Sequence, residues 1–423
     1  MRPSINPHVL NLKASPTLAI NQRVMQLRTS GEEVYHFGFG QSPFPVPRAI
    51  QAALIEHADK NSYLPTRGLP ELCEAIAVFY DEQCGCSLSP DQVVVGPGSK
   101  ELIFQVLYLL QGPLLIPAPS WVSYGPQATL RGKEIVTIET RRKLGYRLQA
   151  DELHQACRGS VDSQKILIFN NPNNPSGSSH SEQEIKDLAA VCRTHQIIVI
   201  SDEIYGLVNF RKEKHTSIAH HYPEGTIITG GLSKAFSAGG YRLGVMIIPP
   251  ELENILQALE SMISETFSAV SAPIQYAALA AYRYSDEVRE GVERCTDIHC
   301  FTAEYLHQRF IDMDLNCPKP EGGFYLFPDF DHFREPLLAR GIVTSRQLTE
   351  ALLTEARVAM LPGSDFYLPD SHLGVRVASV DYDGEHVLHE FPGASAMDEK
   401  QLTTLFPNLV HGCDRLNGFL ANL

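Results

Sequence analysis

The sequence has no excess of positive charge. Lys and Arg number 35 against 49 Asp and Glu, so the formal net charge is −14 at pH 7. Nucleic-acid phosphates require clustered Lys and Arg, and anionic membrane surfaces attract polybasic segments. Because neither pattern is present, we expect a protein that binds neither nucleic acid nor a membrane.

Long hydrophobic runs are missing as well. No apolar stretch approaches the roughly 20 residues that a membrane-spanning helix needs. The N-terminal sequence MRPSINPHVLNLK has no apolar core of the length found in signal peptides. These absences predict a cytoplasmic protein.

The cysteines show no organisation. There are nine, an odd number, and the close pair Cys84 and Cys86 is not followed by histidines at the spacing of zinc ligands. Reduced structural thiols are therefore expected, with no metal site. Internal repeats and low-complexity segments are also missing.

The middle of the sequence alternates short β-rich runs with helical segments. The apolar runs are short enough for strands and apolar enough to be buried on both faces; they cover residues 93–95, 114–116, 135–138, 166–169, 197–200, 226–229 and 244–248. This alternation is typical of an α/β fold with a mainly parallel central sheet flanked by helices.

The helical patterns suggest how the chain divides. Residues 1–47, with one helix at about 18–29, are predicted to form an N-terminal arm and part of a small domain. Residues 48–290, with helices at 48–58 and 69–83, are predicted to form a large domain. A long helical region from about residue 251 towards residue 310 leads into a smaller α+β domain, residues 291–423.

One segment concentrates unusual chemistry. TGGLSKAFSAGGYRLG, residues 229–244, places Lys234 and Arg242 among glycines and hydroxyl residues after an apolar strand. A half-buried lysine loses solvation, so its amine can become a nucleophile that forms a Schiff base. Arg242 could bind a phosphate with its guanidinium fork. The alternative is an ordinary loop with two surface cations.

Other polar residues also follow predicted strands, where ligands of open α/β sheets bind. Gly98, Ser99 and Lys100 begin a helix whose free N–H groups suit a phosphate. Trp121, the turn-rich NNPNNPSG, and Asp202 follow three further strands. Taken singly, a tryptophan at such a place can belong to the core, and an aspartate can cap a helix.

Taken together, SDEIY, NPNNPSG and SKAFSAGGYRLG resemble the fold-type I pyridoxal-phosphate enzymes of the class I/II, aspartate-aminotransferase-like group. The resemblance extends from Ser15 to Arg376. It implies a homodimeric aminotransferase that moves an amino group between an L-amino acid and a 2-oxo acid through a lysine aldimine, with the cofactor bound by the large domain, residues 48–290.

The resemblance also implies roles for matching residues. Lys234 would hold pyridoxal 5'-phosphate as an internal aldimine and move the substrate proton. Asp202 would pair with the pyridine nitrogen, since a protonated ring is a better electron sink. The remaining cofactor contacts would come from Tyr205 and Asn174 at the phenolic oxygen, Trp121 on the ring, and Gly98, Ser99, Lys100, Ser233 and Arg242 at the phosphate. For Lys100, the main-chain amide is expected to matter more than the ammonium.

Substrate and subunit contacts are implied in the same way. Arg376 would grip the substrate α-carboxylate with a bidentate fork. Gly40 would add a main-chain N–H to this carboxylate, beside Trp121 and Asn174. Tyr63 would reach the phosphate of the neighbouring subunit, which makes the enzyme an obligate homodimer.

Two places depart from the family pattern. Gly231 stands where relatives often have a hydroxyl residue, so a phosphate contact is either missing or replaced by Thr229. After Arg376, the acidic, turn-rich residues 379–402 intervene before the last helix. They are interpreted as a solvated surface hairpin or, alternatively, as an element of substrate specificity.

Alternatives remain open at this point. A lyase or cyclising synthase of the same fold would use the same cofactor residues, and a ligand-sensing domain of a transcription regulator would share the fold. The preferred side chain of the substrate is also open. Acidic substrates need a second cation, for which Arg67, beside Tyr63 and therefore expected at the dimer interface, is the candidate; the alternative is an ordinary surface or interface arginine. Apolar substrates need only a wall that Phe37, Phe39 or Tyr124 could supply.

Overall fold

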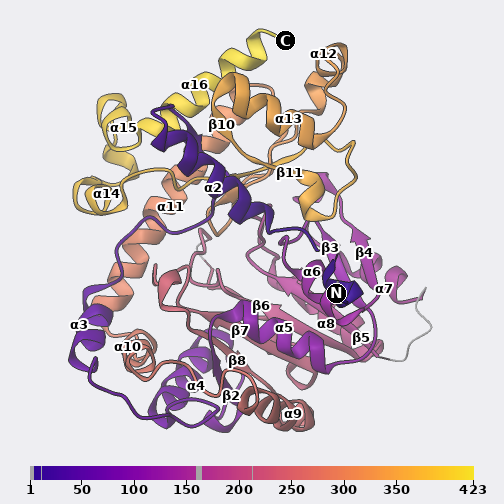
Figure 1. Ribbon diagram of the computed structural model, residues 1–423, viewed down its shortest axis with the longest axis vertical. Coiled ribbons are helices and arrows are strands. Elements are labelled where there is room, and N and C mark those ends of the chain that lie inside the picture. The colour runs from indigo at the N-terminus through magenta and orange to yellow at the C-terminus, as the bar shows by residue number, and fades with distance from the viewer. Residues whose placement is uncertain (1–3, 11, 159–163, 212) are drawn as a thin grey trace.

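The computed structural model describes residues 4–10, 12–158, 164–211 and 213–423. In Figure 1 a twisted sheet with its covering helices fills the lower half, and the C-terminal helices with several short strands lie above it. The N-terminal helix α2 lies in the upper part beside the C-terminal elements, although α3 and α4, which follow it in the sequence, lie below.

The large sheet has seven strands in the order β2-β8-β7-β6-β5-β3-β4. The five strands from β7 to β4 are parallel, and β8 runs antiparallel to both of its neighbours. This confirms the predicted mainly parallel sheet. The strands are β2 (Val93–Gly96), β3 (Leu114–Ala118), β4 (Ile135–Glu139), β5 (Lys165–Asn170), β6 (Ile197–Asp202), β7 (Thr226–Gly231) and β8 (Gly244–Ile247).

Burial along the strands depends on their neighbours and on the helices that cover them. All residues of β5 and β6 are buried, because each of these strands has a neighbour on both sides and helices on both faces. The prediction of burial on both faces is wrong for β4. This strand forms the edge of the sheet beside β3, and of its five residues only Ile138 is buried, whereas β2 at the opposite edge is buried against α4 and α5.

Helices cover both faces of the sheet. Ile166 and Ile168 of β5 pack on one face with side chains of α5, α6 and α9, whereas Leu167 and Phe169 pack on the other with α7 and α8. A third cluster joins β2, β7 and β8 to α4 and α10. The helices are α3 (Arg48–Glu56), α4 (Pro70–Cys84), α5 (Ser99–Leu109), α6 (Tyr124–Arg131), α7 (Ala150–Arg158), α8 (Glu182–Thr194), α9 (Glu253–Ser264) and α10 (Ala272–Tyr282).

The helix ends show ordinary capping chemistry. Pro70 occupies the first turn of α4, where its missing N–H is not needed, and Gly85 ends the helix in the left-handed region at φ 62°. Ser181 and Glu184 form a reciprocal capping box at the start of α8. Predicted and observed helices therefore differ by only one or two residues at 69–83 and 48–58.

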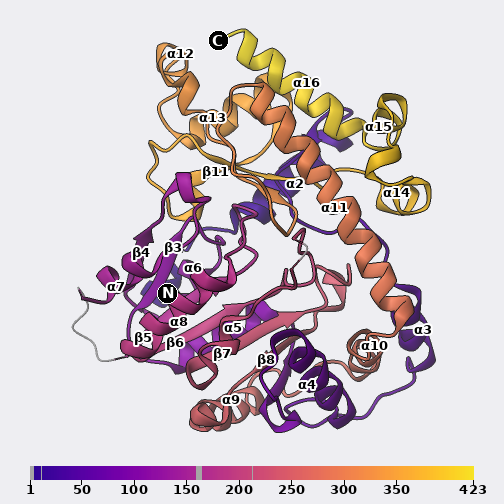
Figure 2. The ribbon, with the colours of Figure 1, turned by 180° about the vertical axis from the view of Figure 1, so that it is seen from behind.

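A single long helix connects the two halves of the fold. α11 (Asp286–Asp312) has Val288 and Val292 in the cluster with α4 and α10, and Leu306 and Phe310 in the core of the C-terminal part. Figure 2 shows it running from the bottom of the molecule to the top. The predicted domain boundary at residue 290 falls inside this helix, and the division into domains stays a prediction.

The C-terminal part is built from short strands and helices. β11 (Leu361–Pro362), β12 (Val375–Ala378) and β9 (Tyr325–Leu326) form one antiparallel sheet, and β1 (Tyr35–His36) pairs with β10 (Val358–Ala359) in parallel. The N-terminal segment thus contributes a strand to this part. The other elements are α1 (Pro7–Leu10), α2 (Pro16–Thr29), α12 (Arg334–Ala339), α13 (Ser345–Ala351), α14 (Gly384–Glu390), α15 (Glu399–Leu405) and α16 (Pro407–Ala421).

The segment after Arg376 is not a hairpin. Residues 379–402 contain α14 and the start of α15, and Val380, Val387 and Phe391 are buried. The turn-rich composition concealed a short amphipathic helix whose apolar side packs on the C-terminal core. Among the residues that the structure describes, no helix combines the length and apolar character that crossing a bilayer requires.

Candidate active site

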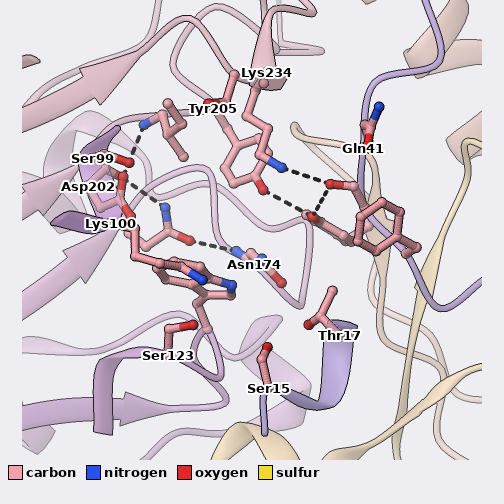
Figure 3. Close-up of a pocket in the computed structure, with 18 of the residues that line it drawn as sticks. Ser15, Thr17, Gln41, Ser99, Lys100, Ser123, Asn174, Asp202, Tyr205 and Lys234 are labelled. Atoms are coloured by element: carbon pink, nitrogen blue, oxygen red, sulfur yellow. Dashed lines mark hydrogen bonds between the residues drawn. The ribbon is translucent and has the colours of Figure 1, made fainter. Parts of the chain in front are cut away.

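A pocket of about 310 Å³ lies where the carboxyl ends of β5, β6 and β7 meet the C-terminal part of the fold. Its walls come from the start of α2, the loops after the strands, and β12. All predicted site residues except Gly98 and Tyr63 line it. In Figure 3 Lys234 and Tyr205 lie on one side of this pocket, and Ser15 and Thr17 lie on the opposite side.

Lys234 follows β7 directly and reaches into the pocket half-buried. Its Nζ donates a hydrogen bond of 2.8 Å to the main-chain oxygen of Gly40, shown in Figure 3. The ammonium also lies 5.7 Å from the ring centre of Tyr205 and 5.4 Å from that of Phe324. The amine is thus held over aromatic rings without an ion pair to a carboxylate in the described chain.

Asp202 is the last residue of β6 and is buried. The Tyr124 hydroxyl donates to its Oδ2 at 2.7 Å, and the Ile204 N–H donates to its Oδ1 at 3.3 Å. Burial raises the pKa of this carboxyl to about 6, and the hydrogen bond from Tyr124 acts in the opposite direction. The residues that follow form a turn rather than an α-helix, so Asp202 does not cap a helix.

Asn174 and Tyr205 lie near one another in the middle of the pocket. The N–H of Asn174 donates to Oδ1 of Asn170 at 2.7 Å, which fixes the turn-rich loop after β5. The Tyr205 hydroxyl donates to the Tyr325 hydroxyl at 3.1 Å. The pKa of Tyr205 is raised because burial disfavours the phenolate.

Trp121 forms a wall of the pocket and is only partly buried. Tyr124 packs edge-on against it, with ring centres 5.2 Å apart and an angle of 82°. The ammonium of Lys100 lies 5.0 Å from the indole centre, and burial lowers the pKa of this lysine. The tryptophan is therefore an aromatic surface at the site rather than a core residue.

A group of donors gathers at the start of α5. Gly98 has φ +99°, and no side chain caps the free N–H groups of the helix. A methyl group at Gly98 would overlap the Arg242 guanidinium. Arg242 is held by the main-chain oxygens of Gly239 at 2.9 Å and Pro97 at 3.2 Å. Free N–H groups, a guanidinium, and the hydroxyl groups of Ser99 and Ser233 fit a phosphate.

Arg376 lies on β12 and is 1% exposed. Its Nη2 donates to the Gly38 oxygen at 2.6 Å and its Nη1 to Asn174 Oδ1 at 3.3 Å, whereas its Nε is buried without a partner. Within the described chain it forms no ion pair, since Asp365 pairs with Arg346 instead. Burial lowers the pKa of this guanidinium. An uncompensated buried cation in a pocket favours an anionic ligand.

A model of the family "Aminotransferase class I and II" matches residues 32–384. The chain belongs to this family. The group that fits the pocket is therefore pyridoxal 5'-phosphate, because the phosphate donors, the amine of Lys234 and the buried carboxyl of Asp202 line one cavity. The predicted family and fold class are confirmed.

The relatives of this aminotransferase are themselves aminotransferases. The aspartate aminotransferase of Geobacillus stearothermophilus is 34% identical over 372 residues, which are 86% of this chain and 92% of that protein. A probable aspartate/prephenate aminotransferase of Aquifex aeolicus is 33% identical over 383 residues, covering 87% of this chain and 93% of the relative.

Solved structures of aminotransferases superpose on nearly the whole chain. The aspartate aminotransferase from Thermus thermophilus with maleate has a TM-score of 0.85 at 25% identity, covering 99% of this chain and all of the other. The aromatic aminotransferase from Pyrococcus horikoshii has a TM-score of 0.79 at 28% identity, covering 94% and 99%. The chain is an enzyme, a pyridoxal-phosphate-dependent transaminase, and the lyase or synthase alternative is not favoured.

Some sequence expectations about this aminotransferase are wrong. Thr229 does not replace a phosphate contact, because its hydroxyl donates to the Val245 oxygen at 3.0 Å inside the sheet. Gly231 has no side chain because a methyl group there would overlap the main chain at Leu243 and Gly244. Phe37 is no pocket wall, since it is buried in the C-terminal core against Gly412.

Two predicted residues lie away from the pocket. Arg67 donates to the main-chain oxygen of Asp91 at 2.8 Å and pairs with its carboxylate at 3.3 Å, so it does not reach the site of its own chain. Tyr63 is 95% exposed and does not line the pocket of its own chain either. Gly98 borders the pocket through its contact with Arg242.

Sequence reasoning missed several residues of the pocket. Tyr325 lies between Tyr205 and Arg376, with its ring centre 4.7 Å from the guanidinium carbon. Thr17, at the start of α2, has a buried hydroxyl with no hydrogen-bond partner in the described chain. The sequence indicates Tyr124 only as an apolar wall, without its hydrogen bond to Asp202. No spacing rule connects these residues to the strand ends, so only the fold brings them together.

Proposed function

We propose that this aminotransferase binds its cofactor at Lys234 and exchanges the amino group of an α-amino acid with a 2-oxo acid. The observation that carries the proposal is the buried guanidinium of Arg376, which has no carboxylate partner in the described chain and lines one pocket with Lys234 and Asp202. Both reactants of a transamination carry an α-carboxylate, so one arginine serves both halves of the reaction.

The residues that would hold the cofactor fall into three groups. The start of α5 with Ser99, Ser233 and Arg242 would hold its phosphate, and Trp121 would cover the face of its ring. Asp202 would pair with the ring nitrogen, with Tyr205 and Asn174 at the phenolic oxygen. When bound, the cofactor supplies an electrophilic carbonyl and an electron-withdrawing ring.

Lys234 would act as the base and the acid at the substrate Cα. Its Nζ is held by the Gly40 oxygen at 2.8 Å, a hydrogen bond that keeps the amine in the pocket without fixing it in an ion pair. The amine would accept the proton from Cα and return it on the cofactor side. The nearby rings of Tyr205 and Phe324 would limit the access of water to this amine during proton transfer.

Arg376 would orient the substrate through a bidentate fork on the α-carboxylate. Gly38 and Asn174 already occupy one hydrogen of each terminal nitrogen, which holds the planar group in place. The unpartnered Nε adds a donor. The main-chain N–H of Gly40 would complete the carboxylate site.

The substrate that we propose carries a second carboxylate. Lys100 lines the pocket and forms no ion pair in the described chain, and the unpartnered hydroxyl of Thr17 also lines it. These two groups would supply the second cation and donor within the chain, where Arg67 is held by Asp91. The proposal is further supported by relatives named aspartate aminotransferases and by a related structure solved with maleate, a dicarboxylate.

We further propose a cytoplasmic homodimer. Tyr63 is 95% exposed in the single chain, and large aromatic side chains are seldom fully exposed to solvent, which supports an interface at this position. In the dimer this tyrosine would reach the phosphate of the second subunit. The proposed organisation is an arm at 1–47, a large domain at 48–290 and a small domain at 291–423, with the pocket between the two domains.

Two measurements test the proposed function. Purified protein is given a panel of amino acids with 2-oxoglutarate or pyruvate, and aspartate or glutamate should be the preferred donor. Borohydride reduction followed by peptide mapping should place the cofactor on Lys234. Turnover of one amino acid without any 2-oxo acid, or label on another lysine, would contradict the proposal.

A further inference from the structure

The loop at residues 38–44 forms one wall of the active site through three polar contacts. The oxygen of Gly38 accepts from Arg376 Nη2 at 2.6 Å, and the oxygen of Gly40 accepts from Lys234 Nζ at 2.8 Å. The hydroxyl groups of Ser42 and Ser237 are 2.6 Å apart. A shift of this loop therefore moves the partners of both the guanidinium and the amine.

The opposite side of the loop packs against the start of α14. A methyl group at Gly384 would overlap the carbonyl group of Pro43 and crowd the nitrogen of Phe44. Asp383 accepts a hydrogen bond of 3.1 Å from the His386 N–H and so fixes the first turn of the helix. The main chain at Gly384 therefore lies against the main chain at Pro43 and Phe44, and a side-chain rotation on either side cannot relieve an overlap there.

Aromatic contacts extend this support into the long helix. Phe44 lies 5.0 Å from the His299 ring and 5.9 Å from the Tyr382 ring, measured between centres. The Tyr382 hydroxyl is 3.4 Å from His299 Nδ1. His299 packs in turn against Phe324, 5.0 Å away, over which Lys234 lies. Burial lowers the pKa of His299 to about 3, so this ring is neutral at physiological pH.

Asp381 fixes the chain just before the loop 38–44. Asp381 accepts from the His36 N–H at 2.7 Å and pairs with Arg28 Nη2 at 2.8 Å. The segment 381–384 therefore contacts the chain both at residue 36 and at residues 43–44. Figures 1 and 2 both show α14 beside α11, which carries His299.

We propose that residues 381–384, which we call the support segment, are a positioning element for the loop 38–44 and set the affinity for both substrates. None of these residues lines the pocket. They act through the loop on the oxygens that hold Arg376 and Lys234. The inference rests on the proposed function, because it assumes that these two residues meet the substrate.

The support segment should affect substrates more than cofactor. The phosphate donors at Gly98, Ser99 and Arg242 belong to the loops that follow β2 and β7, and Asp202 ends β6. A displaced loop 38–44 leaves them in place. The α-carboxylate site, in contrast, loses its alignment, and misplacement by about 1 Å costs up to roughly 100-fold in catalysis.

The direct test is Gly384→Ala in the full-length enzyme. The KM values for the amino donor and for the 2-oxo acid should rise together, each by about 5- to 50-fold. The cofactor absorbance spectrum and cofactor affinity should stay within about twofold of the wild type. Gly418→Ala is the matched control, because a methyl group at this position of α16 meets nothing within 4 Å.

A second pair of variants applies even if Gly384→Ala does not fold. Tyr382→Leu removes the ring against Phe44 and should raise both KM values, whereas Tyr382→Phe keeps this ring and should restore them to within about threefold of the wild type. Unchanged KM values in Tyr382→Leu, or a change confined to thermal stability, would overturn the inference. Absence of transamination in the wild type would instead overturn the proposed function.

Discussion

The hydroxyl group of Tyr124 donates a hydrogen bond of 2.7 Å to Oδ2 of Asp202. The same tyrosine packs edge-on against Trp121. It therefore connects two walls of the pocket, the carboxyl group at the end of β6 and the aromatic surface after β3. Asp202 is buried, and Tyr124 is one of the few groups in the described chain that stabilise the negative charge of its carboxylate.

Tyr124→Phe should weaken cofactor binding. Loss of a hydrogen bond to a buried charged group costs about 1.5–3 kcal/mol, so the dissociation constant of the cofactor should rise about 10- to 150-fold. The measurement is titration of cofactor-free protein followed by absorbance. Tyr108→Phe, at a partly exposed position of α5, is the control. Unchanged affinity in Tyr124→Phe would show that the hydroxyl does not contribute to the charged carboxylate.

The stability of the cofactor-free enzyme should depend on pH through Asp202. Its folded-state pKa of about 6 exceeds the ordinary value of 3.8, so folding favours the protonated carboxyl. The protonated carboxyl therefore contributes about 3 kcal/mol to the free energy of unfolding below pH 4, and this contribution is lost as the pH rises through 6. Asp202→Asn should abolish this component. Denaturant unfolding at pH 4 and 7 measures it, and a pH-independent difference between variant and wild type would contradict the assignment.

Arg376→Lys should weaken donor and acceptor together. A lysine cannot reproduce two parallel hydrogen bonds to a carboxylate, and the expected loss is about 1.5–3 kcal/mol for each substrate. Cofactor content should not change. Half-reactions followed by absorbance separate the two substrates. If only one of them were affected, the view that a single arginine serves both would be wrong.

Lys100→Met should change the choice of substrate. The variant keeps an unbranched apolar stem but removes the ammonium, so kcat/KM for aspartate should fall by about 10-fold or more. Activity with alanine, which has no second carboxylate, serves as the internal control. Equal losses for both amino acids would indicate that the ammonium serves the cofactor rather than the substrate.

Sequence reasoning succeeded where local chemistry is distinctive. The apolar runs at 166–169 and 197–200 became buried strands, and Lys234, Asp202 and Arg376 all line one pocket. It failed where a contact depends on residues that are far apart in the sequence. β4 is exposed because it forms a sparsely covered edge, whereas β2, at the other edge, is buried against α4 and α5. The Thr229 hydroxyl bonds within the sheet because of the register of β7 with β8. Neither property is encoded in the neighbouring residues.

The helix α14 shows a second reason why an element could not be predicted from the sequence. Gly, Pro and acidic residues in 379–402 suggested a solvated turn, and single apolar residues such as Val387 carried too little signal to indicate a helix. Its burial depends on Phe391 and Val387 meeting a core assembled from residues far away in the sequence. Likewise, Tyr325 is part of a short strand that gives no hint of the pocket.

The helix α11 has a consequence for folding cooperativity. At 27 residues it is about 40 Å long, and it inserts its first turns into one hydrophobic core and its later turns into another. Loss of either core would leave half of this helix without tertiary contacts, and an isolated helix of that length is marginal in water. We therefore expect the two cores to unfold in one shared transition.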